Sequence, residues 1–226
     1  MTPVWHNGPL STLRCPPSTP VVWSVRLTSP AASEALAVVR ASTLDFSDAA
    51  RGGGEGARRL ARRLVGRALV ARLAGCHSDM VKIDRKQTGA PVVVTPLGWH
   101  IGFSARNDNC LIGAARFPIA VDRESLDGAI VLADMLTPAE AKTIDLALPP
   151  DQRLQWMRRW TIKEAFAKLT SAPRMMRPET IETVLNEDGT AMATHDGRIA
   201  LCWSRVHDGG VETMATWATS SWPQHS

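Results

Sequence analysis

Trp160-Thr-Ile-Lys-Glu-Ala-Phe-Ala-Lys168 is the stretch that decides the fold, and it lies inside a longer helical pattern. The spacing of apolar residues predicts one long helix over 151–170. On this helix Trp160, Glu164 and Lys168 are four residues apart, so their side chains share one stripe. Trp160 is suited to anchoring that stripe in a core, with Glu164 and Lys168 emerging at its edge. The same Glu164–Lys168 spacing is also typical of an ordinary salt bridge on a helix surface.

An acidic pair precedes the helix, in Ile119-Ala-Val-Asp-Arg-Glu124. Asp122 and Glu124 are two residues apart on a predicted strand, so both side chains point to the same face. Two carboxylates on one face repel each other unless a cation lies between them. Mg²⁺ prefers such hard oxygen ligands, together with water and phosphate oxygens. With Glu164 as a third carboxylate the pattern indicates a magnesium site, and a strand-end pair without function is the alternative.

The rest of the chain alternates between predicted strands and helices, which favours an α+β fold. The predicted helices beyond the first are a short one after Ser33, an arginine-rich one over 57–74 and one that begins with a capping box at Thr137 and Glu140. The predicted strands are 21–27, 92–95, the hairpin 99–104 with 110–115, a strand that begins at 117, and a meander from 183 to 219. We expect an irregular leader over 1–20, an N-terminal half over 21–117 and a C-terminal half over 118–226.

Composition limits the possible partners. Of the 226 residues 44% are hydrophobic, which is enough for a packed core, and the net charge of +4 suits an acidic partner without indicating nucleic acid. The basic helix over 57–74 is either a solvated face or a contact for phosphates or an acidic protein. The four scattered cysteines form no zinc pattern and are typical of reduced thiols. Without a membrane-spanning run or a signal peptide pattern, we expect a cytoplasmic protein that binds neither membrane nor nucleic acid.

The two motifs together resemble those of one enzyme family. Ile119–Glu124 resembles the (I/V)G(I/V)DxE motif of the surfactin-type 4′-phosphopantetheinyl transferases, and Trp160–Lys168 resembles their WxxKEAxxK motif. Leu136-Thr-Pro-Ala-Glu140 is similar to the intermediate FSxxE segment of that family. Thr88-Gly-Ala-Pro-Val92 is similar to its GKP turn, and Gly102-Phe-Ser-Ala-Arg106 aligns with its N(L/I)SHS segment. The resemblance extends over about residues 50 to 220.

The resemblance implies a fold, a reaction and a set of roles. It implies two similar halves with pseudo-two-fold symmetry and coenzyme A bound between them. It also implies a monomer that transfers 4′-phosphopantetheine from coenzyme A to a serine of an acyl or peptidyl carrier protein, as in secondary metabolite biosynthesis. Asp122, Glu124 and Glu164 would be the Mg²⁺ ligands. Glu140 would be the general base, with a plain capping glutamate as the alternative, and Lys163 and Lys168 would contact pyrophosphate or help the proton transfer.

Three departures from the family pattern concern phosphate recognition. Ala71, Ala90 and Ala105 stand where the family has an arginine, a lysine and a histidine. The remaining candidates for coenzyme A binding are Arg67, Arg72, Lys86, Gly89, Pro91, Ser104 and Arg106, and Arg85 and His100 are further possible replacements. The alternative is a diverged relative, non-catalytic or with another donor, that binds a carrier protein or a phosphorylated ligand at the same site.

Overall fold

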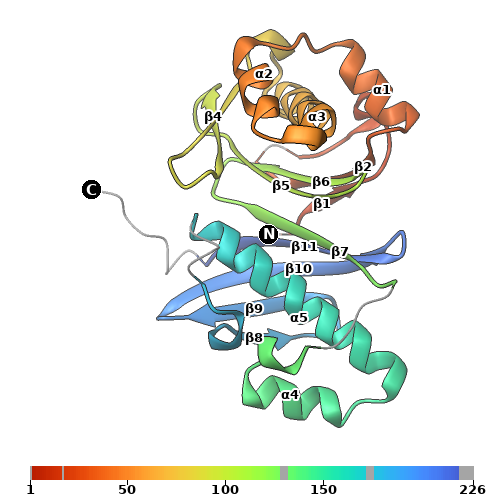
Figure 1. The fold of residues 1–226 in the computed structure, drawn as a ribbon, viewed down its shortest axis with the longest axis vertical. Helices are drawn as coiled ribbons and strands as arrows, with labels where there is room; N and C mark the ends of the chain where they lie inside the picture. Colours follow the sequence, from red (N-terminus) through yellow and green to blue (C-terminus); the bar gives the residue numbers. More distant parts are fainter. Residues whose placement is uncertain (1, 17, 128–131, 172–175, 219–226) are drawn as a thin grey trace. The chain divides into compact units, whose positions relative to one another are not determined.

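The computed structural model describes residues 2–16, 18–127, 132–171 and 176–218. Its contacts divide the chain into two compact units, Met1–Phe117 and Pro118–Ser226. Each unit is a β-sheet with helices packed on it (Figure 1), so the predicted mixed α+β class is confirmed. Within the described ranges, no helix combines the length and the apolar character that crossing a bilayer requires.

The sheet of the first unit has the strand order β1-β2-β6-β5. Its strands are β1 (Val4–His6), β2 (Val21–Arg26), β6 (Asn109–Ala115) and β5 (His100–Arg106). β5 and β6 pair antiparallel, which confirms the predicted hairpin. A separate two-stranded sheet pairs β3 (Lys82–Arg85) with β4 (Pro91–Thr95).

The expected irregular leader contains one short strand and one 3-10 turn, and part of it packs into the core. β1 pairs parallel with β2, and Leu10 and Leu13 are buried in the core of this unit. The indole nitrogen of Trp23, whose side chain is fully buried, donates to the Gly8 carbonyl at 3.0 Å. A buried indole N–H needs such an acceptor, which ties the segment down. A three-residue strand flanked by prolines is too short to show a periodicity in the sequence.

Three helices pack on one side of this sheet (Figure 1): α1 (Pro30–Ala37), α2 (Thr43–Ala50) and α3 (Gly56–Ala74). α3 confirms the predicted basic helix, and it buries Val65 and Leu69 completely. Gly66 allows α3 to lie close to β5, because a Cβ at this position would be 2.5 Å from the Phe103 ring. α1 begins earlier than predicted, because its N-cap is Ser29, whose hydroxyl accepts from the Ala32 amide.

The second unit has a five-stranded antiparallel sheet with the order β7-β11-β10-β9-β8. The strands are β7 (Ala120–Ser125), β11 (Gly210–Trp217), β10 (Arg198–His207), β9 (Thr190–His195) and β8 (Glu182–Leu185). The predicted meander lacked β9. Its Ala191-Met-Ala193 run has little strand propensity, and the strand forms because it is paired on both sides.

Two helices complete this unit, α4 (Pro138–Asp145) and α5 (Pro149–Leu169). α5 crosses the sheet (Figure 1) and buries Ile162, Ala165 and Phe166 completely against it. The structure thus confirms the long helix predicted around the tryptophan motif. Short 3-10 turns lie at Leu10–Thr12, Gly53–Glu55, Ser78–Met80, Ala133–Met135 and Pro178–Thr180.

Candidate active site

The two sequence motifs of the second unit are joined by an ion pair. Lys168 Nζ on α5 lies 2.6 Å from Asp122 Oδ1 on β7, and the same ammonium donates to the Val121 carbonyl at 3.3 Å. Asp122 is almost completely buried, whereas the Lys168 side chain is 29% exposed. The contact places the acidic strand beside the end of α5 that carries Glu164 and Lys168.

Glu164 is electrostatically coupled to both carboxylates of the acidic strand. Burial raises the pKa of Glu164, the negative charge of Asp122 and then that of Glu124 raise it further, and Lys168 partly opposes them. Desolvation and like-charge repulsion therefore both disfavour the ionised form of Glu164. Three carboxylates in such an arrangement have the donor chemistry that suits a divalent cation.

Asp122, Glu124 and Glu164 do not lie in the arrangement of a formed metal centre. Within the described ranges, no group of three or more His, Cys, Asp or Glu side chains has a geometry that could hold a metal ion. In this arrangement the ammonium of Lys168 neutralises Asp122. The donor set fits Mg²⁺ by its chemistry, and the ligand assignment of Asp122, Glu124 and Glu164 stays a prediction.

The middle residue of the acidic motif, Arg123, stabilises the opposite face of β7. Its Nε lies 3.3 Å from Oε1 of the fully buried Glu212, which also binds Arg205 Nη2 at 2.8 Å. Gly210 lets the neighbouring strand approach, because a Cβ there would be 2.6 Å from the Glu124 carbonyl oxygen. β7 and β11 are thereby held in register, which sets the direction of Asp122 and Glu124 on the other face.

Glu140 and Lys163 form a buried ion pair, 2.6 Å apart, with side chains only 4% and 1% exposed. Lys163 uses its three donors on Glu140, on the Met135 carbonyl at 3.0 Å and on the Pro178 carbonyl at 2.9 Å. Glu140 Oε2 also accepts from the Thr137 amide at 2.8 Å, which confirms the predicted capping box. Its Oε1 accepts from the amide and the hydroxyl of Thr183, at 2.9 and 2.5 Å.

Because these contacts occupy the hydrogen-bonding groups of Glu140 and Lys163, they bear on the catalytic roles expected for both residues. A general base needs a lone pair directed at the proton it takes, and a phosphate contact needs a donor directed at the phosphate. Here both oxygens of Glu140 and all three protons of Lys163 serve contacts within the protein. The geometry favours the alternative interpretation of Glu140, as a capping and packing residue, and the same structural role for Lys163.

The first unit contains a pocket of about 240 Å³ between α2, α3 and the strands below them. It is lined by Asp48, Arg59, Arg62, Arg63, Ile83, Arg85, Pro91, Phe103 and Ala105. Sites for whole drug-sized ligands usually measure ~300–1,000 Å³, so this pocket suits one part of a ligand. Four arginines and an apolar wall indicate a group that is anionic at one end and flat or apolar beside it.

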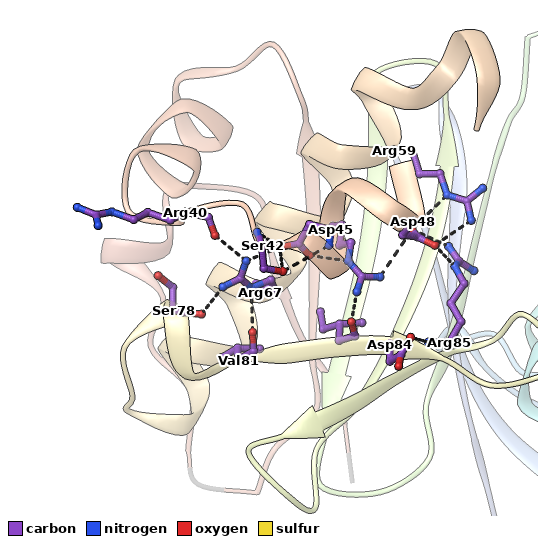
Figure 2. A network of polar contacts seen from close by, with 12 residues as sticks. Arg40, Ser42, Asp45, Asp48, Arg59, Arg67, Ser78, Val81, Asp84 and Arg85 are labelled. Carbon is purple, nitrogen blue, oxygen red and sulfur yellow. Dashed lines mark hydrogen bonds and ion pairs between the residues drawn. The ribbon is translucent and has the colours of Figure 1, made fainter. Parts of the chain in front are cut away.

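α2 carries two aspartates (Figure 2), of which Asp48 lines this pocket and Asp45 binds arginines of α3. The helix begins with a capping box, in which the Ser42 amide donates to Asp45 Oδ2 at 2.8 Å. Asp45 also binds Arg63 Nε at 2.5 Å and Arg67 Nη1 at 2.6 Å, so it ties α2 to α3. Neither α2 nor its aspartates were predicted from the sequence. The Ser42-x-x-Asp45 spacing is the signal that would have found them.

Arg67 and Arg72, which were expected to contact coenzyme A, both donate to backbone carbonyls of the protein. Arg67 is 3% exposed and donates to the carbonyls of Val81, Ser78 and Arg40 at 2.8–2.9 Å. Arg72 donates to the carbonyls of Leu10 and Leu13, both at 3.2 Å. Both arginines therefore hold loops in place. Of the other expected residues, Pro91 lines the pocket, and outside its lining are Lys86, Gly89, Ser104 and Arg106.

The raised pKa of Glu164 leads to a pH-dependent stability. The folded-state pKa lies above the ordinary value of 4.5, so the penalty is absent at more acidic pH, where the carboxyl is protonated in both states. The penalty grows as the pH rises from that value through the folded-state pKa. In metal-free buffer we therefore expect Glu164→Gln to be more stable than the wild type at pH 7.5 and equally stable near pH 4, measured by urea unfolding. A difference of the same size at both pH values would contradict the repulsion.

Comparison with known families finds one match. Residues 118–220 match the model of the 4′-phosphopantetheinyl transferase superfamily. The matched range lies in the second unit, which carries the acidic strand and α5. No curated protein matches the chain. The match supports this superfamily and, in general terms, a transferase of phosphopantetheine.

Proposed function

We propose that this chain is a surfactin-type 4′-phosphopantetheinyl transferase, which moves phosphopantetheine from coenzyme A to a serine of an acyl or peptidyl carrier protein in a Mg²⁺-dependent reaction. The Lys168–Asp122 ion pair carries the proposal, because it joins the two motifs that define the resemblance. The coupling of Glu164 to Asp122 and Glu124 supports it further. The proposal includes a monomer that acts in the cytoplasm, on a carrier of secondary metabolism.

The proposed Mg²⁺ ligands are Asp122, Glu124 and Glu164. When bound, the ion would supply positive charge for phosphate oxygens. Lys168 lies beside the same carboxylates and is partly exposed, so its ammonium can donate to a phosphate oxygen as a compact cation. The buried Arg123–Glu212 contact keeps the acidic strand in register while the ligand set is used.

In the proposed reaction the bonds form and break on the two substrates, and no protein side chain becomes covalently attached. The serine oxygen of the carrier forms a bond to the β-phosphorus of coenzyme A, and the bond from that phosphorus to the bridging oxygen breaks. The serine gives its proton to water, and 3′,5′-ADP leaves with the electron pair of the broken bond. The protein contributes position and charge neutralisation. Taken by itself, the first unit offers Arg62 to an anionic group in its pocket.

Mass spectrometry of apo carrier proteins tests the proposal. We expect at least one acyl or peptidyl carrier protein, incubated with the chain, coenzyme A and Mg²⁺, to gain the mass of phosphopantetheine on its serine. A carrier with that serine changed to alanine is the control and should gain nothing. If no carrier gains the arm and calorimetry detects no coenzyme A binding, the proposal is wrong.

A non-catalytic relative is the second candidate, and one observation favours it. Two of the four arginines in the pocket, Arg59 and Arg85, are engaged by Asp48, which weakens the attraction for phosphate. This candidate predicts that a carrier associates with the chain without gaining the arm. The two candidates are separated by pairing the mass measurement with a binding measurement on the same carrier.

A further inference from the structure

One carboxylate in the arginine-lined pocket holds two guanidinium groups at once (Figure 2). Arg59 donates through Nε to Asp48 Oδ2 and through Nη2 to Oδ1, both at 3.1 Å. Arg85 donates through Nε to Oδ1 and through Nη2 to Oδ2, the latter at 3.3 Å. Both contacts use two parallel N–H bonds, which is the geometry in which arginine also binds a phosphate.

Asp48 stays ionised in this position. Burial by itself would raise its pKa, but hydrogen bonds from Arg85 and Arg59, followed by their positive charges, outweigh burial and hold the pKa well below its usual range. Its side chain is 7% exposed, so the carboxylate is held by its partners and little by water. If a phosphate accepted the N–H groups of Arg59 and Arg85, the buried carboxylate of Asp48 would lose its partners, which costs free energy.

The other two lining arginines differ in their partners. Arg63 is bound to Asp45, lies 3.7 Å from Asp48 Oδ2 through Nη1, and also donates to the Ile83 carbonyl. Within the described ranges, Arg62 is the lining arginine that has no carboxylate partner. Ala105 adds no charge to the wall. The pocket thus offers an anion far less positive charge than its four arginines suggest.

We propose that Asp48 is a specificity-determining residue, which competes with a phosphate monoester for Arg59 and Arg85 and so prevents the pocket from selecting a ligand that carries one. This inference rests on the proposed function, in which the donor is coenzyme A. Coenzyme A ends in a 3′-phosphate monoester, whereas dephospho-coenzyme A lacks it. The wild-type pocket therefore accepts both donors with similar affinity.

Two nucleotides test the competition without turnover. The probes are 3′,5′-ADP and 5′-AMP, which differ by the 3′-phosphate alone, titrated by calorimetry in EDTA so that bound metal does not contribute. For the wild type we expect the two affinities to agree within about threefold. For Asp48→Asn we expect 3′,5′-ADP to bind at least tenfold tighter than to the wild type, with a smaller change for 5′-AMP, because one freed charge-assisted contact is worth about 10–100-fold.

Asp108→Asn is the matched control, because it removes the same charge from an aspartate of this unit that pairs with Arg58 outside the pocket lining. It should leave the ratio of the two affinities at its wild-type value. The inference is overturned if the wild type prefers 3′,5′-ADP tenfold or more, if folded Asp48→Asn keeps the wild-type ratio, or if neither protein binds either nucleotide. The ratio of the two affinities of the wild type is measured without the variant, so it tests the inference even where Asp48→Asn does not fold.

Failure of this inference is distinguishable from failure of the proposed function. Transfer of the arm to a carrier, with coenzyme A and dephospho-coenzyme A compared as donors, reports the reaction directly. Transfer with a strong preference for coenzyme A keeps the function and overturns the role of Asp48. A wild-type ratio near one without any transfer keeps the role of Asp48 in binding and removes the transferase proposal.

Discussion

Glu164→Ala should reduce the rate of phosphopantetheine transfer by about a thousandfold, since removing one group that preorganises charge at a transition state costs ~10²–10³ in rate. Glu164 is the carboxylate of α5 that is coupled to both Asp122 and Glu124. Without it, the proposed cation would keep only the two ligands of the acidic strand. The measurement is the initial rate of arm transfer to an apo carrier, followed by mass spectrometry.

Glu182→Ala is the matched control for this variant. Glu182 is an exposed glutamate on β8 of the same unit, so its loss changes the net charge equally without touching the carboxylate cluster. We expect near wild-type transfer from it. Calorimetric titration with Mg²⁺ gives a second readout, in which Glu164→Ala should bind the ion more weakly than both other proteins. Retained transfer by a folded Glu164→Ala protein would remove Glu164 from the ligand set.

Lys163→Met should lower the free energy of unfolding by about 3–5 kcal/mol, because it leaves the carboxylate of Glu140 buried without its cation. The pair is 2.6 Å apart and both side chains are almost completely buried. Burial lowers the pKa of Lys163, and the hydrogen bond to Glu140 opposes that shift, so each charge depends on the other. Urea unfolding measures the loss, followed by the fluorescence of Trp156 and Trp160, which stack on α5.

An exposed pair in the same unit provides the control. Arg177 lies 2.6 Å from Glu179 but is 79% exposed, so Arg177→Met should cost less than about 1 kcal/mol. The variant Glu140→Gln then distinguishes a structural role of Glu140 from a role as general base. A structural role predicts a clear loss of stability, whereas a general base predicts a stable protein that has lost transfer activity. A Lys163→Met protein as stable as the wild type but inactive would restore the catalytic roles expected from the sequence.

Local patterns predicted the parts of this fold that depend on neighbouring residues. The hairpin of β5 and β6, the basic helix α3 and the capping box of Thr137 and Glu140 all came from spacings of a few residues. The segments that were missed are those whose pairing is long-range. β1 is three residues long and pairs with β2, and β9 is poor in strand-forming residues but has a partner on each side.

The sequence by itself determined the chemical character of the second unit. The acidic strand and the tryptophan motif specify three carboxylates and a lysine at fixed spacings, and these residue types suit phosphate chemistry with a divalent cation. Lys163 came from the tryptophan motif and Glu140 from the Leu136–Glu140 segment, but neither stretch says how deeply these side chains are buried.

Tertiary structure alone decided how each charge is used. Contacts between residues far apart in the chain saturate Glu140 and Lys163, and turn Arg67 and Arg72 into loop anchors. The same kind of contact places Asp48 beside Arg59 and Arg85, for which the sequence offers phosphate as only one of several partners. The physical reason is that a charge acts through the groups within a few ångströms of it, and these groups are set by packing.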